Sequence, residues 1–360
     1  MLRIDALPFM LRFKRPATTS RGVFDTRQVV FLRAESDGVV GWGECGIMPG
    51  LSRDDRPNYS TLIADVCEQI NAGADPATVD LSELPSVAFG LETALRDLDN
   101  GGRQQLFDTP FSRGKAILPT HGLIWMDSPA GMAAQIEQKI ALGCTAIKLK
   151  IGSLAFDEEM GMLVAFRRQH PAAIVELRLD ANGAWRSVDE ALERLEQLAA
   201  IDPLFVEQPL PADRWQEMAA LCAASPVPIA LDEELIAAST ADRRATLLRT
   251  IRPQHVILKP SLLGGLAACE TWIAEAQQLG VQWWINSLLE SNVGLNAIAQ
   301  WTSARDVERT HGLGTGQLFV NNVPSPLRLS GCGLLVVEAV RWDFSTIWHT
   351  TFSPSPWPSP

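Results

Sequence analysis

Two lysines stand close together in a short apolar stretch near the middle of the chain. Residues 146–151 read AIKLKI, with Lys148 and Lys150 as the charged members. Side chains alternate along a strand, so both lysines share one face and the apolar residues take the other. A buried ammonium group without a partner is costly, so we expect carboxylates beside them.

Charged residues recur where the following apolar runs end. Asp180, Glu207 and Asp232 each follow one run, and Lys259 follows another. Counted from Lys150, the gaps are 30, 27, 25 and 27 residues, which suit one strand plus one helix. In a parallel arrangement these strand ends meet at one edge. The sequence therefore predicts a single site built from successive strand ends.

Three carboxylates at one site repel each other unless a cation neutralises them. Asp180, Glu207 and Asp232 offer the oxygen ligands that Mg²⁺ prefers, with Mn²⁺ as an alternative. For any one of them alone, a helix cap or a salt bridge is the simpler explanation. The set of three, with lysines at both ends of the series, favours a metal site.

The lysines are candidates for proton transfer. Lys150 and Lys259 belong to strands several places apart, so we expect them to face each other across the site. A lysine with the usual pKa of about 10.4 is a poor base, but a metal ion, Lys148 and partial burial would lower that pKa. Lys148 would tune the site or pair with a carboxylate. Arg178 shares the face of Asp180 and is predicted either as an ion-pair partner or as a pocket wall.

The elements that must position these residues alternate between strand and helix from about residue 115. Ser128-Pro129 is a helix-start signal, Ser187 and Glu190 form a capping box, and helices are expected near 213–224, 239–249 and 265–279. This pattern predicts a parallel (β/α) barrel, with an open doubly wound sheet as the alternative. A barrel is favoured because carboxylates from three strands converge around a ring.

The first 110 residues follow another pattern, strands first and helices after. Residues 11–13, 29–32 and 38–44 indicate an antiparallel meander, and residues 61–66 and 87–98 indicate helices. This predicts an α+β domain. The loop expected between the first two strands, residues 14–22, contains Thr18, Thr19 and Ser20. We expect it to close over an anionic substrate, with a plain solvated hairpin as the alternative.

Composition excludes several classes of function. The net charge of −11 over 360 residues disfavours nucleic acid as a partner. No apolar run approaches 18 residues and the start carries early charge, so we expect a cytoplasmic protein without a membrane partner. Six scattered cysteines without a C-x-x-C pair are expected to be reduced core residues. Glu234 is expected at the surface, and Glu233 is a candidate partner for Lys259.

The motifs together resemble the enolase superfamily, in its muconate lactonizing enzyme-like subgroup. Within it they are similar to the o-succinylbenzoate synthases of menaquinone and phylloquinone biosynthesis. The matching pieces, in chain order, are Lys148-Leu149-Lys150, Arg178-Leu179-Asp180-Ala181-Asn182, Val206-Glu207-Gln208-Pro209, Ala230-Leu231-Asp232-Glu233 and Ile257-Leu258-Lys259-Pro260.

The resemblance implies a modified TIM barrel at 111–325, a capping domain at 1–110, and, at 326–360, a return to that domain together with the proline-rich tail. It implies a Mg²⁺-dependent lyase that dehydrates 2-succinyl-6-hydroxy-2,4-cyclohexadiene-1-carboxylate, a small-molecule carboxylate. Asp180, Glu207 and Asp232 would hold the metal, Lys150 would move the proton, and Lys259 would stabilise the intermediate. The remaining implied contacts are supporting residues Asn182 and Glu233 and substrate-binding residues Lys148, Arg178, Ser291, Asn292, Gly314 and Thr315.

Other activities remain open at this point. N-succinylamino acid racemases share nearly all of these motifs. Dipeptide epimerases usually show Asp-x-Asp near the last barrel strand, where residues 320–323 here read VNNV. A non-catalytic barrel serving as a binding protein need not keep both lysines and all three carboxylates, and a Schiff-base aldolase has no use for the carboxylates.

Overall fold

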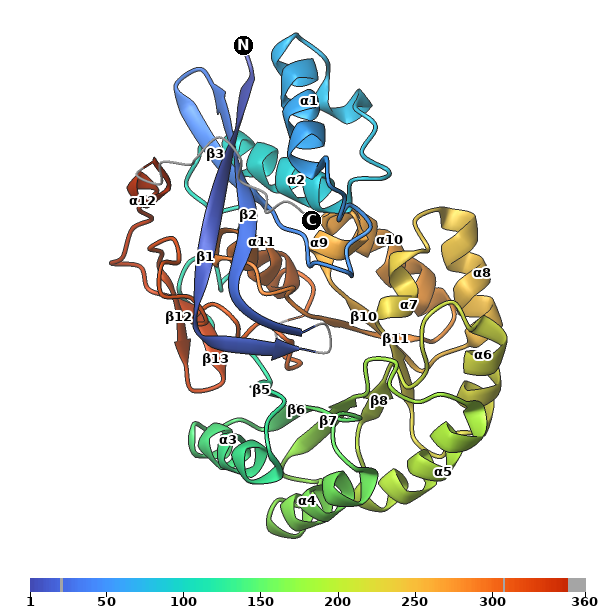
Figure 1. Ribbon diagram of the computed structural model, residues 1–360. Coiled ribbons are helices and arrows are strands. Elements are labelled where there is room, and N and C mark those ends of the chain that lie inside the picture. The colour runs from blue at the N-terminus through green and yellow to red at the C-terminus, as the bar shows by residue number, and fades with distance from the viewer. Residues whose placement is uncertain (20–21, 307, 349–360) are drawn as a thin grey trace.

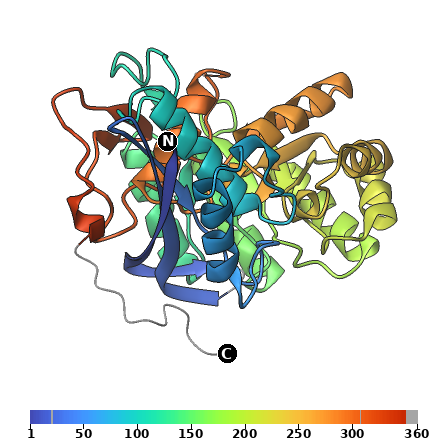
Figure 2. The same ribbon diagram turned by 90° about the horizontal axis from the view of Figure 1, so that it is seen from above.

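The computed structural model describes residues 1–19, 22–306 and 308–348. It consists of an N-terminal sheet with two helices and a curled parallel sheet surrounded by helices (Figure 1). Seen from above, the N-terminal sheet and helices α5 to α8 occupy separate sides of the molecule (Figure 2). The proline-rich tail, residues 353–360, lies outside the described residues.

The N-terminal domain is an antiparallel sheet covered by two helices. Strands β1 (Arg3–Thr19), β2 (Gly22–Ser36) and β3 (Val39–Cys45) pair in that order, and α1 (Tyr59–Asn71) and α2 (Pro85–Asp99) lie against them. A Cβ atom on Gly43 would lie 2.0 Å from the carbonyl oxygen of Gly90, so the close approach of β3 and α2 requires glycine. A short 3₁₀ helix, η1 (Pro76–Thr78), connects the two helices.

The first hairpin is longer than the sequence pattern predicts. Residues 14–19, expected in a loop, continue β1, and β2 begins at Gly22. Thr18 pairs with Val23 and Thr19 with Gly22, so two of the three predicted lid residues lie in the ladder. Ser20 lies outside the described residues. A strand is recognised in a sequence by alternating apolar and polar residues. Small polar residues interrupt that alternation here, so the sequence did not indicate a strand.

Seven parallel strands form the curled sheet. They follow one another in chain order: β5 (Gly122–Ile124), β6 (Ala146–Lys150), β7 (Glu176–Asp180), β8 (Phe205–Glu207), β9 (Ile229–Leu231), β10 (His255–Leu258) and β11 (Gln282–Ile285). The ring closes through two isolated bridges, Asn286 with Gly312 and Thr120 with His311. These observations confirm the predicted (β/α) barrel with an α+β domain beside it.

Helices cover the outside of the barrel. They are α3 (Pro129–Ala141), α4 (Phe156–Gln169), α5 (Val188–Leu198), η2 (Ala199–Ile201), α6 (Trp215–Ala224), α7 (Glu233–Ile236), α8 (Ala241–Ile251), α9 (Pro260–Leu263), α10 (Leu266–Gln278) and α11 (Asn292–Ser303). Both predicted caps are present: Ser128 Oγ accepts from Gly131 N and Ser187 Oγ accepts from Glu190 N, each at 3.2 Å. Each cap satisfies a backbone donor that the helix leaves free.

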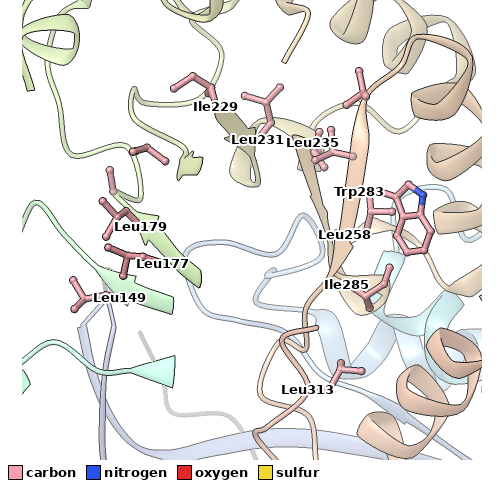
Figure 3. Packing of buried hydrophobic residues seen from close by; sticks show 14 of the residues in the cluster. Leu149, Leu177, Leu179, Ile229, Leu231, Leu235, Leu258, Trp283, Ile285 and Leu313 are labelled. Atoms are coloured by element: carbon pink, nitrogen blue, oxygen red, sulfur yellow. The ribbon is translucent and has the colours of Figure 1, made fainter. Parts of the chain in front are cut away.

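The main core lies between the strands and these helices. Figure 3 shows its labelled side chains on successive strands, among them Leu149, Leu177, Leu179, Ile229, Leu231 and Leu258. They alternate with inward residues, so the same strands present polar groups to the ring interior. Phe205, Ala230, Ile257 and Trp284 form a separate cluster of buried residues on neighbouring strands.

The chain then leaves the barrel and returns to the N-terminal domain. Strand β12 (Leu327–Ser330) pairs with β13 (Gly333–Val336), and β13 pairs with β4 (Leu118–Pro119), which precedes the barrel. Phe344, just before α12 (Ser345–Trp348), stacks on Trp42 with ring centroids 4.5 Å apart. No helix among residues 1–19, 22–306 and 308–348 is long and apolar enough to cross a membrane.

One expectation about the cysteines is wrong. Cys144, which precedes β6, and Cys332, in the turn between β12 and β13, form a disulfide across 188 residues of sequence. Sequence spacing could not reveal this pair because only the fold brings the two segments together. Cys45, Cys67, Cys222 and Cys269 are free and buried, as expected.

Candidate active site

Strand register brings the predicted charged residues together. Lys150 on β6 pairs with Asp180 on β7, and Asp180 pairs with Glu207 on β8. Asp232 follows β9 directly and Lys259 follows β10 directly. All three carboxylates are almost fully buried, with exposures of 2%, 0% and 3% in chain order. The five strand ends therefore meet on the inner side of the ring.

Lys148 joins two of the carboxylates. Its Nζ lies 2.6 Å from Oε1 of Glu207 and 3.0 Å from Oδ2 of Asp180. Burial alone would lower the pKa of Lys148, but the charges of Asp180 and Glu207 raise it above its usual value. Lys148 is therefore a permanent cation that holds two carboxylates in place. Of its two predicted roles, the geometry supports that of carboxylate partner.

Lys150 points toward a polar chain that ends at Glu233. Its Nζ lies 3.2 Å from Oδ2 of Asp180 and 2.5 Å from Oδ1 of Asn182. Asn182 in turn donates from Nδ2 to Oε1 of Glu233 at 3.0 Å. Asn182 has a φ of +45°, a conformation that Asn tolerates better than most residues. The backbone turn after β7 thus aims the amide oxygen at the lysine.

Lys259 forms an ion pair with Asp232. Burial alone would lower the pKa of Lys259, but the charge of Asp232 raises it. Lys259 does not form the expected ion pair with Glu233 among the described residues, since Glu233 accepts from Asn182 instead. Burial and the charge of Asp232 raise the pKa of Glu233.

Of the three carboxylates, Glu207 is the one whose negative charge is least balanced by neighbouring groups. Burial, and then the charge of Asp180, raise its pKa to about 8 although Lys148 opposes the shift. Its Oε2 atom is buried and has no hydrogen-bond partner among the described residues. A buried oxygen without a partner is costly, and a cation beside it would remove that cost.

The three carboxylates fit a hard divalent cation by their chemistry, because they supply oxygen ligands. Within the described ranges they do not form a compact group of metal ligands, because Asp180, Glu207 and Asp232 are each turned toward a lysine. The lysines thus act as counter-ions at the positions where a cation would bind. The unpartnered Oε2 of Glu207 is the observation that favours such a cation.

Gln208 fixes the start of the short helix α7. Its side-chain oxygen accepts from the backbone N–H groups of Asp232 at 3.1 Å and Glu234 at 3.2 Å. Glu234, expected at the surface, is only 2% exposed and accepts from the backbone N–H of Asp213 at 2.9 Å. That expectation is wrong because Glu234 is buried as the hydrogen-bond acceptor for a backbone N–H group of the loop after β8. Both residues set the position of Asp232.

A cavity of about 150 Å³ contains both catalytic candidates. Lys148, Lys150, Asp180, Asn182, Glu233 and Lys259 line it together with Met48, Leu51, Trp125, Asn286, Ser287, Leu288, Leu289, Gly312, Gly314, Thr315 and Leu318. Met48 and Leu51 come from the N-terminal domain, so both domains build the cavity. Phe13 and Phe24 of the long hairpin pack in the same apolar cluster as Met48 and Leu288.

The predicted substrate-binding residues divide into two groups. Gly314 and Thr315 line the cavity. Ser291 and Asn292 do not, because the start of α11 is already occupied by Glu44 of the N-terminal domain. Glu44 accepts from Ser291 N at 2.9 Å, and Asn292 N donates to Asn322.

Arg178 lies one step below the site on β7. Its Nε donates to Oε1 of Glu176 at 2.7 Å, its Nη2 to Thr310 at 2.7 Å, and its guanidinium stacks on Trp284 at 3.9 Å. It does not line the cavity described above. Of its two predicted roles, the geometry supports the ion pair.

The sequence reasoning missed the residues that end β11. Asn286 follows an apolar run in the same way as Asp180 and Glu207, so the same signal marked it. Ser287, Leu288 and Leu289 line the cavity. They lie a few positions before Ser291 and Asn292, the residues that were expected to bind substrate. Met48 and Leu51 carried no signal, because only the docking of the two domains brings them to the barrel.

Two family models match the chain. Residues 131–323 match the model described as enolase C-terminal domain-like, and residues 4–100 match the N-terminal domain of mandelate racemase and muconate lactonizing enzyme. The first match covers more than half of the chain. The two matched ranges correspond to the barrel and to the N-terminal domain.

Individual relatives agree with these models. An o-succinylbenzoate synthase from Desulfotalea psychrophila is 43% identical over 91% of this chain and 97% of its own. The crystal structure of MenC from the same organism has a TM-score of 0.83 and 38% identity, covering 93% of this chain and 99% of its own. An L-Ala-D/L-Glu epimerase from Bacillus subtilis is 24% identical over 85% of each chain.

Proposed function

The chain belongs to the enolase superfamily, and from this premise we propose that it is an o-succinylbenzoate synthase. The reaction is the syn dehydration of 2-succinyl-6-hydroxy-2,4-cyclohexadiene-1-carboxylate to 2-succinylbenzoate, a step toward menaquinone or phylloquinone. The main structural support is that Lys150, Asp180 and Lys259 line one cavity. The 43% identical relative with that name supports the choice within the family. The proposal includes a capping domain at 1–110, a barrel at 111–325 and a return segment at 326–360.

We assign the metal site to Asp180, Glu207 and Asp232. A bound Mg²⁺ would neutralise the negative charge that develops on the carboxylate of the substrate when a proton leaves the neighbouring carbon. Lys148 would keep two of the ligands in position from below, through its contacts at 2.6 and 3.0 Å. The buried Oε2 of Glu207, which has no partner among the described residues, supports this assignment.

Lys150 carries the proton in this proposal. As the neutral amine it removes the proton next to the substrate carboxylate, and the resulting ammonium group donates that proton to the departing hydroxyl on the same face. One residue therefore serves both steps of a syn elimination. Asn182 positions the amine through its 2.5 Å contact, and Glu233 holds Asn182. Lys259 contributes its positive charge from the other side of the cavity.

Racemisation of N-succinylamino acids is the second candidate. It is favoured by the same observation, since Lys150 and Lys259 line one cavity and belong to strands β6 and β10. Racemisation needs a proton on the opposite face, which Lys259 would deliver. A dipeptide epimerase is less well supported: Asn321 and Asn322 bind Arg12 N and Asn292 N instead of lining the cavity.

The decisive experiment is incubation of the purified protein with the cyclohexadiene substrate and Mg²⁺. Formation of 2-succinylbenzoate, followed by ultraviolet absorbance as the ring becomes aromatic, is the expected result. N-succinylamino acids of both hands are tested in parallel by polarimetry. Racemisation without dehydration would replace the first proposal by the second, and turnover of neither substrate would reject both.

A further inference from the structure

The cavity that contains Lys150 extends to the gap where the barrel closes. Thr120, His121 and Leu123 line it from the β5 side, and Gly312 and Gly314 line it from the closing segment. Among the described residues, the ring is joined here by two isolated bridges, Thr120 with His311 and Asn286 with Gly312. Lys139 of α3, Leu329 and Cys332 also line the cavity.

Lys139 is the cavity lysine without an anionic partner among the described residues. Lys148, Lys150 and Lys259 each form an ion pair with a carboxylate, whereas Lys139 forms none with the described residues. Its stem packs beside Gly122, where an added Cβ would lie 3.0 Å from Cβ and Cγ of Lys139. Partial burial lowers the pKa of Lys139. A half-buried ammonium group in a cavity is a binding group for an anion.

His121 and Lys139 line the same cavity. The pKa of buried His121 is lowered first by burial, then by Arg178 and Lys148, with His311 and Lys139 contributing further. The shared lining is the geometric observation that places Lys139 at the cavity.

Thr120 provides a second unsatisfied group in the lining of the same cavity. It is 1% exposed, and its Oγ1 atom has no hydrogen-bond partner among the described residues. A Cβ atom on Gly314 would lie 3.3 Å from that hydroxyl, so the glycine leaves space in front of it. A buried hydroxyl normally has a partner, and a ligand oxygen would supply one.

We infer that Lys139 and Thr120 bind a second carboxylate of the substrate, at the end of the cavity opposite the carboxylate that is activated for proton loss. This inference rests on the proposed function and deepens it, because the substrate then has to be a dicarboxylate. The succinyl chain of the proposed substrate ends in such a group. Thr120 donates its hydroxyl hydrogen to one oxygen, and Lys139 forms a charge-assisted hydrogen bond with the other.

The test compares Lys139→Met with Lys139→Arg and Lys115→Met. Methionine keeps the stem beside Gly122 and removes the charge, arginine keeps the charge, and Lys115 is an exposed lysine that does not line the cavity. Lys139→Met should raise KM about 10- to 100-fold while kcat stays within about twofold, as expected for an ion pair present in ground state and transition state alike. Lys139→Arg should restore most of KM, and Lys115→Met should leave it unchanged.

A binding measurement separates this inference from the reaction itself. Calorimetry compares 2-succinylbenzoate with its monoamide at the succinyl end, using the Mg²⁺-loaded protein. The wild-type protein should prefer the dicarboxylate about 10-fold or more, and Lys139→Met should lose that preference. Thr120→Val should weaken binding of the dicarboxylate to a smaller extent and covers the case that Lys139→Met does not fold.

Two results would overturn the inference: an unchanged KM in Lys139→Met, or equal affinity of the wild-type protein for dicarboxylate and monoamide. Failure of the proposed function is a different result. In that case the wild-type protein does not convert the cyclohexadiene, and the preference for the dicarboxylate with its loss in Lys139→Met still supports the second carboxylate site.

Discussion

Replacement of Lys148 by Met should destabilise the metal-free protein strongly. Lys148 Nζ contacts Glu207 at 2.6 Å and Asp180 at 3.0 Å, and both carboxylates are nearly inaccessible to water. Breaking a buried ion pair by removing one partner costs about 3–5 kcal/mol. With an unfolding entropy of about 2.1 cal/mol/K for each of 360 residues, that loss lowers the midpoint of unfolding by about 4–7 °C.

The effect of Lys148→Met should grow with pH. Glu207 has a folded-state pKa of about 8, above the usual value near 4.5, so folding takes up a proton and stability falls as pH rises between these values. Lys148 lowers that pKa, and its removal moves the pKa further up. The deficit of the variant is therefore expected to be larger at pH 8.5 than at pH 6.

Calorimetric unfolding at both pH values, with and without Mg²⁺, measures these effects. Mg²⁺ should recover part of the loss, because a divalent cation replaces the missing ammonium charge. Lys115→Met is the control for the change in net charge, since Lys115 is exposed. An unfolding midpoint of Lys148→Met equal to that of the wild-type protein in EDTA would refute the reasoning that this lysine compensates the carboxylates.

Four further predictions concern activity. EDTA should abolish turnover and Mg²⁺ or Mn²⁺ should restore it, which atomic absorption and a rate assay check together; full activity of metal-free protein contradicts the metal assignment. Lys150→Ala should lower kcat by about 10⁴-fold or more, since base and acid vanish together. Lys259→Arg should keep more dehydratase than racemase activity because guanidinium does not exchange protons near neutral pH; equal losses argue against a one-lysine mechanism. Replacing Thr18, Thr19 and Ser20 by Ala should impair turnover and change the free energy of unfolding by less than about 0.5 kcal/mol. Unchanged kinetics would mean that this hairpin has no role in closing the site.

The strand ends could be predicted from sequence because one physical rule governs them all. In a parallel barrel the carboxyl ends of strands meet at one edge, so Asp180, Glu207 and Asp232 had to converge once the strand and helix rhythm was recognised. The same rule applies to Asn286, which directly follows β11 but was not among the predicted site residues. Local caps such as Ser187 were predictable because the hydrogen bond joins residues three apart.

Features made by distant segments could not be predicted in this way. The closing segment contributes single bridges at His311 and Gly312, which are too short to show a strand pattern. The disulfide of Cys144 joins segments 188 residues apart, and no local signal marks it. Ser291 had the sequence of a substrate-binding helix start, but Glu44 from the other domain satisfies it instead.

The contact between Glu44 and α11 has a consequence for the order in which the chain folds. Glu44 is 1% exposed and accepts from the backbone N–H groups of Ser291 and Gly294, which lie 247 and 250 residues later. During synthesis the N-terminal sheet emerges first, yet its buried carboxylate lacks these donors until the ribosome has made almost all of the barrel. The N-terminal domain therefore keeps part of its surface exposed until α11 has been synthesised and has packed against it. Hydrogen exchange pulsed during refolding should show the amides of Ser291 and Gly294 among the last to be protected.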